Sequence, residues 1–295
     1  MPGEMAEGAP IRLSFAGREF DLGRPWVMGI VNVTPDSFSD GGRFFDPEAA
    51  VAHGLALAAQ GADVLDVGGE STRPGSEPVE AAEELRRVLP VVEALARRAG
   101  VPVSIDTTKA VVAEQAAAAG ARLVNDISGL RFDPELADVV RARGLGLIVM
   151  HSRGRPKDMQ DAPHYDDVLE EVTRELEQAL DRAAARGVPR EATIVDPGLG
   201  FAKRLSDNLA LLAGLPVLRA RLGRPLLVGP SRKSFLGAIT GAAVGDRLPG
   251  TLAAVAAAVL GGADWVRVHD VREARQAADV AAAIRAAAPT GAHRA

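Results

Sequence analysis

Residues 121–151, ARLVNDISGLRFDPELADVVRARGLGLIVMH, contain one complete copy of the pattern that decides the fold. The short apolar run Ala121–Ile127 predicts a strand that is covered on both faces. Asp133, which a proline follows, is typical of a helix N-cap, and Gly144 is typical of the residue that ends a helix. A second apolar run, Leu145–His151, predicts the next strand. This order predicts two parallel strands joined by a helix.

The same unit recurs along most of the chain. The expected strands are Trp26–Val33, Ala62–Gly68, Val101–Asp106, Ala121–Ile127, Leu145–His151, Thr193–Asp196, Pro225–Gly229 and Trp265–His269. The expected helices cover roughly residues 46–60, 78–99, 109–119, 133–143, 166–187, 205–213, 251–262 and 271–288. Strict alternation predicts a parallel sheet, and eight units fit a closed (β/α)₈ TIM barrel better than an open sheet.

We expect a single barrel domain over residues 26–288. In the N-terminal extension, residues 1–25, two alternating runs flank Ala16 and Gly17, which predicts a short β-hairpin that closes the bottom of the barrel. Residues 289–295 are expected to form a frayed tail. No stretch is rich enough in glycine, serine or proline to indicate a linker between two domains.

The composition restricts the classes of function. The chain has 295 residues, 47% of them hydrophobic, and a formal net charge of -5. The absence of cysteine excludes a disulfide framework, a thiolate metal site and a cysteine nucleophile. The acidic balance argues against a nucleic-acid partner. The longest apolar stretch, Leu252–Ala263, is too short for a membrane helix, and the first residues lack a targeting pattern, so we expect a soluble, cytoplasmic protein without a membrane partner.

In a TIM barrel the chemistry lies at the carboxyl ends of the strands. In the last expected strand, Arg267 and His269 alternate with two valines, so both side chains share the face that points to the barrel mouth. Two neighbouring cations are costly unless an anion joins them, which predicts an anion site. The alternative is a salt bridge to an aspartate of a neighbouring strand.

Polar residues also end other expected strands. They are Asn32, Asp66, Asp106, Asn125 and Asp196. A single residue of this kind is most often the N-cap of the next helix, but five at equivalent positions converge on one mouth. The glycine-containing segments 196–203 and 229–235 allow a ligand to approach the backbone closely. The loops 34–42 and 69–76 either close over a substrate or are plain surface connections, and His151 either lines the mouth or satisfies a backbone group.

Eight blocks of sequence follow these strands. They are Met28–Gly42 (MGIVNVTPDSFSDGG), Asp66–Gly75 (DVGGESTRPG), Ser104–Thr107 (SIDT), Val124–Ser128 (VNDIS), Met150–His151 (MH), Asp196–Phe201 (DPGLGF), Ser231–Phe235 (SRKSF) and Arg267–Asp270 (RVHD). In this order they resemble the motifs of dihydropteroate synthases, a family of pterin-binding enzymes. The resemblance runs from about residue 26 to residue 285, and the number and order of the blocks make it specific.

The resemblance implies a TIM-barrel transferase of folate biosynthesis, which joins 4-aminobenzoate to 6-hydroxymethyl-7,8-dihydropterin diphosphate and yields 7,8-dihydropteroate and pyrophosphate. Residues matching the family's pterin site are Asp106, Asn125, Ile127, Met150, Asp196, Gly229 and Lys233. Asn32, Arg267 and His269 match its diphosphate site, and Asn32 also its contact with the cofactor Mg²⁺. Thr72, Arg73, Phe201, Lys233 and Ser234 match its aminobenzoate site. Catalytic roles are expected for Asp40, Asp106, Lys233, Arg267 and His269.

The resemblance also implies an order of events, in which diphosphate leaves first and the amine then attacks the cationic pterin methylene. The family is typically homodimeric and is a sulfonamide target; the apolar helix 251–262 belongs either to such an interface or to the core. Two other functions stay open. A pterin-dependent methyltransferase would lack a diphosphate subsite, and a non-catalytic pterin-binding paralogue would have degraded loops.

Overall fold

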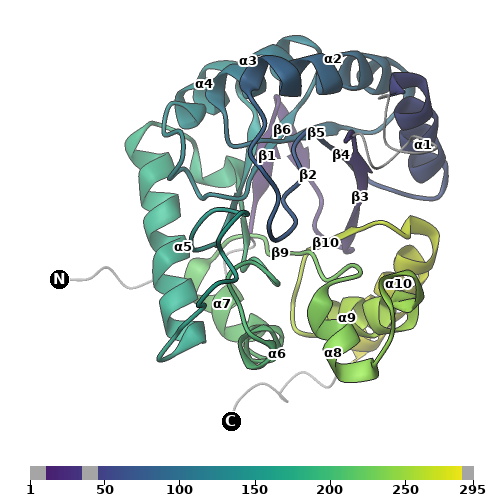
Figure 1. The fold of residues 1–295 in the computed structure, drawn as a ribbon, viewed down its shortest axis with the longest axis vertical. Helices are drawn as coiled ribbons and strands as arrows, with labels where there is room; N and C mark the ends of the chain where they lie inside the picture. Colours follow the sequence, from purple (N-terminus) through teal and green to yellow (C-terminus); the bar gives the residue numbers. More distant parts are fainter. Residues whose placement is uncertain (1–10, 35–45, 288–295) are drawn as a thin grey trace.

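Eight parallel strands form the barrel in the part of the chain that the computed structural model describes, residues 11–34 and 46–287 (Figure 1). They are β3 (Trp26–Asn32), β4 (Val64–Gly68), β5 (Val103–Asp106), β6 (Leu123–Asp126), β7 (Gly146–Met150), β8 (Thr193–Asp196), β9 (Leu227–Val228) and β10 (Trp265–Val268). The sheet order is β8-β7-β6-β5-β4-β3-β10-β9, and a parallel bridge between Val195 and Leu226 joins its two ends. The predicted TIM barrel is confirmed.

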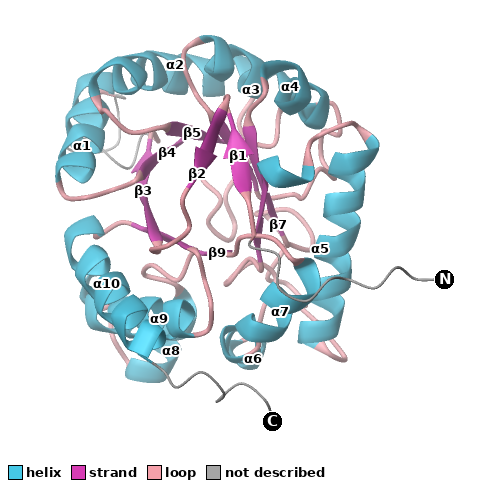
Figure 2. Ribbon diagram, turned by 180° about the vertical axis from the view of Figure 1, so that it is seen from behind, coloured by secondary structure: helices cyan, strands magenta, loops and turns pink. Residues whose placement is uncertain are grey.

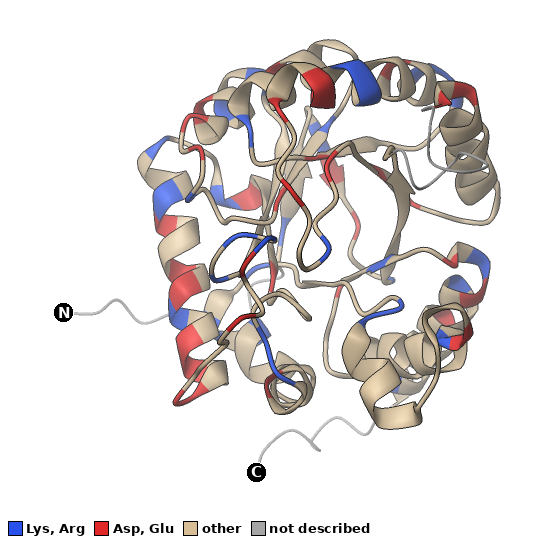
Figure 3. Cartoon of the chain, in the orientation of Figure 1, with Lys and Arg blue, Asp and Glu red and all other residues tan. Residues whose placement is uncertain are grey.

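Helices connect the strands and cover the outside of the barrel (Figure 1). They are α1 (Pro47–Ala59), α2 (Ala81–Arg98), α3 (Ala110–Ala118), α4 (Leu136–Arg143), α5 (Val168–Ala185), α6 (Leu205–Ala213), α7 (Leu215–Leu222), α8 (Ser234–Thr240), α9 (Leu248–Leu260) and α10 (Val271–Ala287). Two 3₁₀ turns, η1 (Arg190–Ala192) and η2 (Val244–Asp246), complete the described elements. In Figure 3 acidic and basic residues are mixed along the outer helices.

The ends of the helices follow local chemistry in part. The Asp46 carboxylate accepts hydrogen bonds from the N–H groups of Glu48 and Ala49, so α1 has an aspartate N-cap. Asp133 is not the N-cap of α4, which starts at Leu136. Its carboxylate instead accepts hydrogen bonds from the N–H groups of Ala110 (2.7 Å) and Glu135 (3.2 Å). Asp133 therefore ties the start of α3 to the turn before α4.

Two helices are absent from the sequence prediction. α7 follows α6 after Gly214, and Pro216 lies in its first turn, where proline sacrifices no intrahelical hydrogen bond. The same Gly-Leu-Pro sequence is equally typical of a loop. α8 has only seven residues, too few for helical periodicity to be visible in the sequence.

The predicted hairpin is also present. β1 (Leu13–Phe15) pairs antiparallel with β2 (Arg18–Phe20). The hairpin is visible in Figure 2, which shows the molecule from behind. The N–H of Ala16 donates to the carbonyl of Gly144 at the end of α4 (2.7 Å). A Cβ at Gly146, the first residue of β7, would lie 2.9 Å from the Phe15 ring. The hairpin therefore packs against the amino ends of the strands, opposite the mouth.

The interior of the barrel and the space beneath the helices are filled by one large apolar cluster, which includes Trp265, Met28 and Leu65. No helix within residues 11–34 and 46–287 is long and apolar enough to cross a membrane. The sequence predictions for the first ten residues, for Asp40 and for the tail after Ala287 lie outside the described residues.

Candidate active site

The carboxyl ends of the barrel strands bring the predicted polar residues together. The pairing register places Asp106 of β5 beside Asn125 of β6, and Met150 of β7 beside Asp196 of β8. Asp106, Asn125 and Asp196 are all buried. Asn32, at the end of β3, is half-buried. Parallel register thus makes neighbours of residues that lie far apart in sequence.

Arg267 is the central cation of this mouth. Its Nε donates to Asp66 Oδ2 (2.6 Å) and its Nη2 donates to Asp106 Oδ2 (2.8 Å). Asn125 Nδ2 donates to the same Asp66 oxygen (3.0 Å). Arg267 therefore forms salt bridges with aspartates of two other strands. From the sequence, such a salt bridge is the alternative to an anion site. The two aspartates hold its guanidinium in a fixed orientation, because a guanidinium donates in a rigid plane.

His269 is not a second cation. Burial, together with the nearby charges of Arg267 and Arg232, lowers the pKa of His269 to about 4. Its ring Nδ1 lies 2.9 Å from the hydroxyl of Ser231, which also accepts a hydrogen bond from the His269 N–H (3.2 Å). The premise of two neighbouring positive charges is therefore wrong at neutral pH. The assignment of both side chains to a diphosphate site stays a prediction.

Burial shifts the pKa values of several titratable groups of the mouth towards neutral pH. It raises the pKa of Asp106 to about 7, although the charge of Arg267 opposes the shift. It raises the pKa of Asp196 to about 6, against a hydrogen bond that the carboxylate accepts from the Gly198 N–H (2.7 Å). It lowers the pKa of Lys233 to about 8. Such a site suits a ligand with both donors and acceptors.

An apolar wall lies beside these polar groups. It is a cluster separate from the main core, made of Ile127, Met150, Met159, Phe201 and Ala202. The Lys233 ammonium lies 4.2 Å from the centre of the Phe201 ring, within the range of a cation–π contact. The structure thus brings together the predicted residues Ile127, Met150, Phe201 and Lys233. Met159, which lies in a segment that also fits the family's pattern but has no role assigned from the sequence, joins them.

The other predicted residues lie around the rim. Thr72 is half-buried, whereas Arg73 and Ser234 are exposed. The charge of Arg73 nevertheless contributes to the lowered pKa of His269, which places its loop near that side of the mouth. The N–H of Gly75 donates to the carbonyl of Pro156 (2.9 Å), so this loop is tied to the loop after β7.

Gly229 lies beside Arg267, where a Cβ would be 3.8 Å from the Cβ of the arginine. The sequence places Asp66 among the polar residues that are expected to converge on the mouth, but assigns it no ligand. The structure makes it the shared acceptor of Arg267 and Asn125, and its Oδ1 is buried with no hydrogen-bond partner among the described residues. In the parallel register Asp66 lies between Ile30 of β3 and Ser104 of β5.

The chain is similar to known proteins over most of its length. A sequence model of the family described as "Pterin binding enzyme" matches residues 28–269. The dihydropteroate synthase of Synechocystis is 48% identical over 267 residues, which cover 90% of this chain and 92% of that protein.

Two solved structures superpose closely. The Yersinia pestis dihydropteroate synthase in a sulfonamide complex gives a TM-score of 0.88 at 44% identity and covers 94% of this chain and 100% of that one. The Xanthomonas albilineans dihydropteroate synthase with 4-aminobenzoic acid gives 0.87 at 48% identity and covers 95% and 100%. The chain therefore belongs to the dihydropteroate synthase family of pterin-binding enzymes.

The raised pKa of Asp106 predicts a pH dependence of stability. A carboxyl that holds its proton more tightly when folded contributes less stability as pH rises from its unfolded pKa, near 4, to its folded pKa, about 7. Asp106→Asn removes this contribution. The free energy of unfolding of the variant minus that of the wild type should therefore increase from pH 4 to pH 7, as measured by urea titration. A difference that stays level or decreases would contradict the shift.

Proposed function

We propose that the mouth of this barrel joins 4-aminobenzoate to 6-hydroxymethyl-7,8-dihydropterin diphosphate, giving 7,8-dihydropteroate and pyrophosphate. The observation that carries the proposal is the buried set Asp106, Asn125 and Asp196 beside an apolar wall, with Lys233 near enough for the charges of both aspartates to act on it. The relatives named dihydropteroate synthase, one of them solved with 4-aminobenzoic acid, support the choice of substrates. The protein is accordingly a transferase.

The pterin ring fits the deepest part of the mouth. Buried polar groups are costly unless they form hydrogen bonds, and a pterin carries both donors and acceptors along its edge. The Asp196 carboxylate can accept two parallel N–H bonds from the amino-pyrimidine edge, and Asn125 and Asp106 can complete the set. Lys233 donates to the carbonyl side of the ring. Ile127 and Met150 contact its apolar face.

The diphosphate fits the side of Arg267, His269 and Asn32. Two N–H groups of Arg267 face Asp66 and Asp106, and the guanidinium keeps three further donors for a substrate anion. His269, neutral in the free site, can donate one N–H or take up a proton once an anion is bound beside it. Anion binding thus needs no basic surface, which is consistent with the net charge of -5.

The reaction then proceeds by loss of the leaving group. The bond between the pterin methylene carbon and the diphosphate oxygen breaks, and its electron pair leaves with the diphosphate. The neutral aromatic amine attacks the cationic carbon, a C–N bond forms, and the amine proton passes to solvent or to pyrophosphate. Asp106 stabilises the positive carbon and Arg267 the departing charge, and each such contact is worth roughly 3–4 kcal/mol in the transition state. Asp40 is assigned the same role as Asp106 by resemblance.

The 4-aminobenzoate is framed on the outer side of the pterin. By resemblance, Phe201 and the alkyl chain of Lys233 contact its ring, and Thr72, Arg73 and Ser234 belong to the opening. In this structure the Lys233 ammonium lies over the Phe201 ring itself, so Lys233 has to move aside for the substrate ring. Arg73 and Ser234 are exposed and suit the carboxylate end, which remains in contact with water. Closure of the loop that carries Thr72 would exclude water, which otherwise captures the cation.

Magnesium is part of this proposal. Among residues 11–34 and 46–287, no group of three or more His, Asp or Glu side chains could hold a metal ion. Asn32 offers one neutral oxygen at the mouth. This donor set fits Mg²⁺, which needs only one or two protein ligands when a diphosphate supplies others. When bound, the ion would offset part of the diphosphate charge.

The function is tested with the purified protein and both substrates. Pyrophosphate release should require the pterin diphosphate, 4-aminobenzoate and Mg²⁺ together. Absence of turnover with this pair would refute the synthase. A non-catalytic paralogue would instead bind the pterin without turnover, and its aminobenzoate binding would not depend on added pterin and pyrophosphate.

Arg267→Ala should lower kcat/KM by roughly 10²–10³, the range for loss of one electrostatic donor to a developing anion. The matched control is Arg272→Ala, an exposed arginine five residues along the chain on α10. Steady-state kinetics with varied pterin diphosphate measure both variants. Unchanged kinetics for Arg267→Ala would remove this residue from the site.

The expected homodimer is a further part of the proposal. α9 buries Thr251, Val255 and Val259 against the core, so the predicted apolar helix is a core element on one face. Its other face forms a groove of about 400 Å³ with α10, lined mainly by Leu252, Ala256, Leu260, Ala277, Val280, Ala281 and Ile284. Leu260, Val280 and Ile284 are 42%, 61% and 57% exposed. A second copy of the chain would cover these side chains.

The double variant Val280→Glu/Ile284→Glu should be monomeric at concentrations where the wild type is dimeric, because it places charge in a buried apolar contact. Val111→Glu, at an exposed valine of α3, is the control and should stay dimeric. Sedimentation velocity measures the three proteins. A monomeric wild type, or a dimeric double variant, would contradict this interface. We also place the enzyme in the cytoplasm, since its charged diphosphate substrate does not cross a bilayer freely.

A further inference from the structure

The loop between β8 and α6 has an unusual backbone. Gly198 and Gly200 have φ values of +69° and +77°, and Ala202, which is not a glycine, has φ of +50°. A left-handed conformation at a residue with a Cβ is unfavourable and persists only where the surroundings hold it. A Cβ at Gly198 would lie 1.9 Å from the carbonyl oxygen of His151. The loop therefore needs contacts that hold it in this shape, and it carries Phe201.

Besides Asp196, which accepts from the Gly198 N–H, three side chains hold the backbone of this loop. Asn208 accepts a hydrogen bond from the Gly200 N–H (2.7 Å), and Gln160 donates to the Gly200 carbonyl (2.7 Å). Lys203 donates from its ammonium to the Phe201 carbonyl (3.0 Å). Lys203 is only 4% exposed, although lysine is among the residue types least often buried. Its buried charge has to be explained by its partners.

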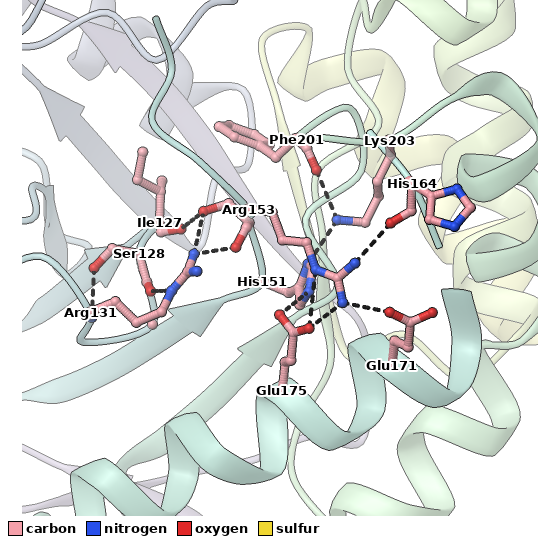
Figure 4. Close-up of polar contacts among 12 residues, drawn as sticks. Ile127, Ser128, Arg131, His151, Arg153, His164, Glu171, Glu175, Phe201 and Lys203 are labelled. Atoms are coloured by element: carbon pink, nitrogen blue, oxygen red, sulfur yellow. Dashed lines mark hydrogen bonds and ion pairs between the residues drawn. The ribbon is translucent and has the colours of Figure 1, made fainter. Parts of the chain in front are cut away.

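Lys203 is held in turn by a chain of buried groups (Figure 4). Its Nζ lies 3.0 Å from Nδ1 of His151, and Nε2 of that ring lies 2.9 Å from a carboxylate oxygen of Glu175 on α5. A lysine ammonium only donates, so Nδ1 accepts and Nε2 carries the proton that His151 donates to Glu175. This ordering fixes the tautomer of His151 and joins α5, the end of β7 and the loop after β8.

Burial lowers the pKa of Lys203 to about 7, so Lys203 carries its third proton below neutral pH, and the ionisation of the other two members agrees with this ordering. Burial, with the charge of Lys203, lowers the pKa of His151 to about 3, so the ring is neutral. Partial burial would raise the pKa of Glu175, but hydrogen bonds from His151 and Arg153 lower it to about 2. Arg153 forms ion pairs with Glu175 and with Glu171. The carboxylate end of the chain is thus a fixed anion.

We propose that Lys203 is a positioning residue for the aminobenzoate side of the site. It holds the main chain of Phe201 so that the ring lies beneath Lys233, and His151 and Glu175 hold Lys203 in place. Lys203 touches none of the reacting atoms, and its ammonium acts through the Phe201 carbonyl. This inference gives His151 a role, which is to hold Lys203. The expected effect on kinetics rests on the proposed function, whereas the expected effect on the loop does not.

Lys203→Met removes the ammonium while keeping most of the side chain. We expect KM for 4-aminobenzoate to rise about tenfold, the scale of one lost hydrogen bond to a charged group, while kcat and the affinity for the pterin diphosphate change less than twofold. The control is the same change at Lys157, whose side chain is 61% exposed and whose ion pair with Glu77 lies on the surface. An equal rise in KM for both substrates, or no rise, would overturn the proposal.

His151 supplies a rescue test and a safeguard if Lys203→Met fails to fold. His151→Asn keeps an acceptor near the place of Nδ1 for Lys203, whereas His151→Leu keeps none. The leucine variant should show the selective rise in KM, and the asparagine variant should recover most of it. A merely structural role would lower the melting temperature of both variants and leave the ratio of the two KM values unchanged.

Hydrogen exchange tests the loop without any turnover. Lys203→Met and His151→Leu should increase exchange in a peptide spanning residues 197–203, where the Phe201 N–H donates to the Gly198 carbonyl (3.1 Å), and leave a peptide from the hairpin unchanged. Unchanged exchange in the loop refutes the positioning role. If the wild type has no synthase activity but both variants show the increased exchange in the loop, the proposed function is refuted and the role of Lys203 in the loop is kept.

Discussion

The pairing of Arg267 with Asp66 and Asp106 is the interaction on which the mouth of this barrel depends. It connects β10 to β4 and β5, so it spans strands that are distant in the chain and brings a cation inside the ring of strand ends. Breaking one side of such a pair leaves a buried charge without compensation, which is far more costly than the pair itself is favourable. The geometry of Arg267 is therefore set before any ligand binds, and a substrate anion meets donors that are already oriented.

Burial decides the charge state of the site more than its neighbours do. The same physical effect raises the pKa of Asp106 and Asp196 and lowers those of Lys233, Lys203 and His269. The pKa values of these acids and bases thus move towards neutral pH together, whereas Arg267 stays charged. This suits a pterin, and it explains why the net charge of the chain is a poor guide to its ligand.

The two sides of the site are supported in different ways. The pterin side consists of strand ends whose positions follow from the parallel register. The aminobenzoate side includes a loop with left-handed backbone at Ala202, which register alone cannot hold. The chain from Glu175 through His151 to Lys203 supplies that support from outside the barrel (Figure 4). Strain at a functional loop is thus offset by a chain of polar groups that are hydrogen-bonded to one another.

The sequence by itself determined the architecture and most members of the site. Alternation of apolar runs with helical segments, helix ends such as Asp46 and Gly144, and motifs after each strand depend on local chemistry, so they are visible in one dimension. It could not reveal α8, which is too short for periodicity, or the true role of Asp133, whose second partner is in another helix. Only the tertiary structure decided that Arg267 is paired, that His269 is neutral, that Asp66 is central and that Lys203 and His151 are buried together. These properties depend on distances between strands and on exclusion of water, and neither is set until the barrel closes.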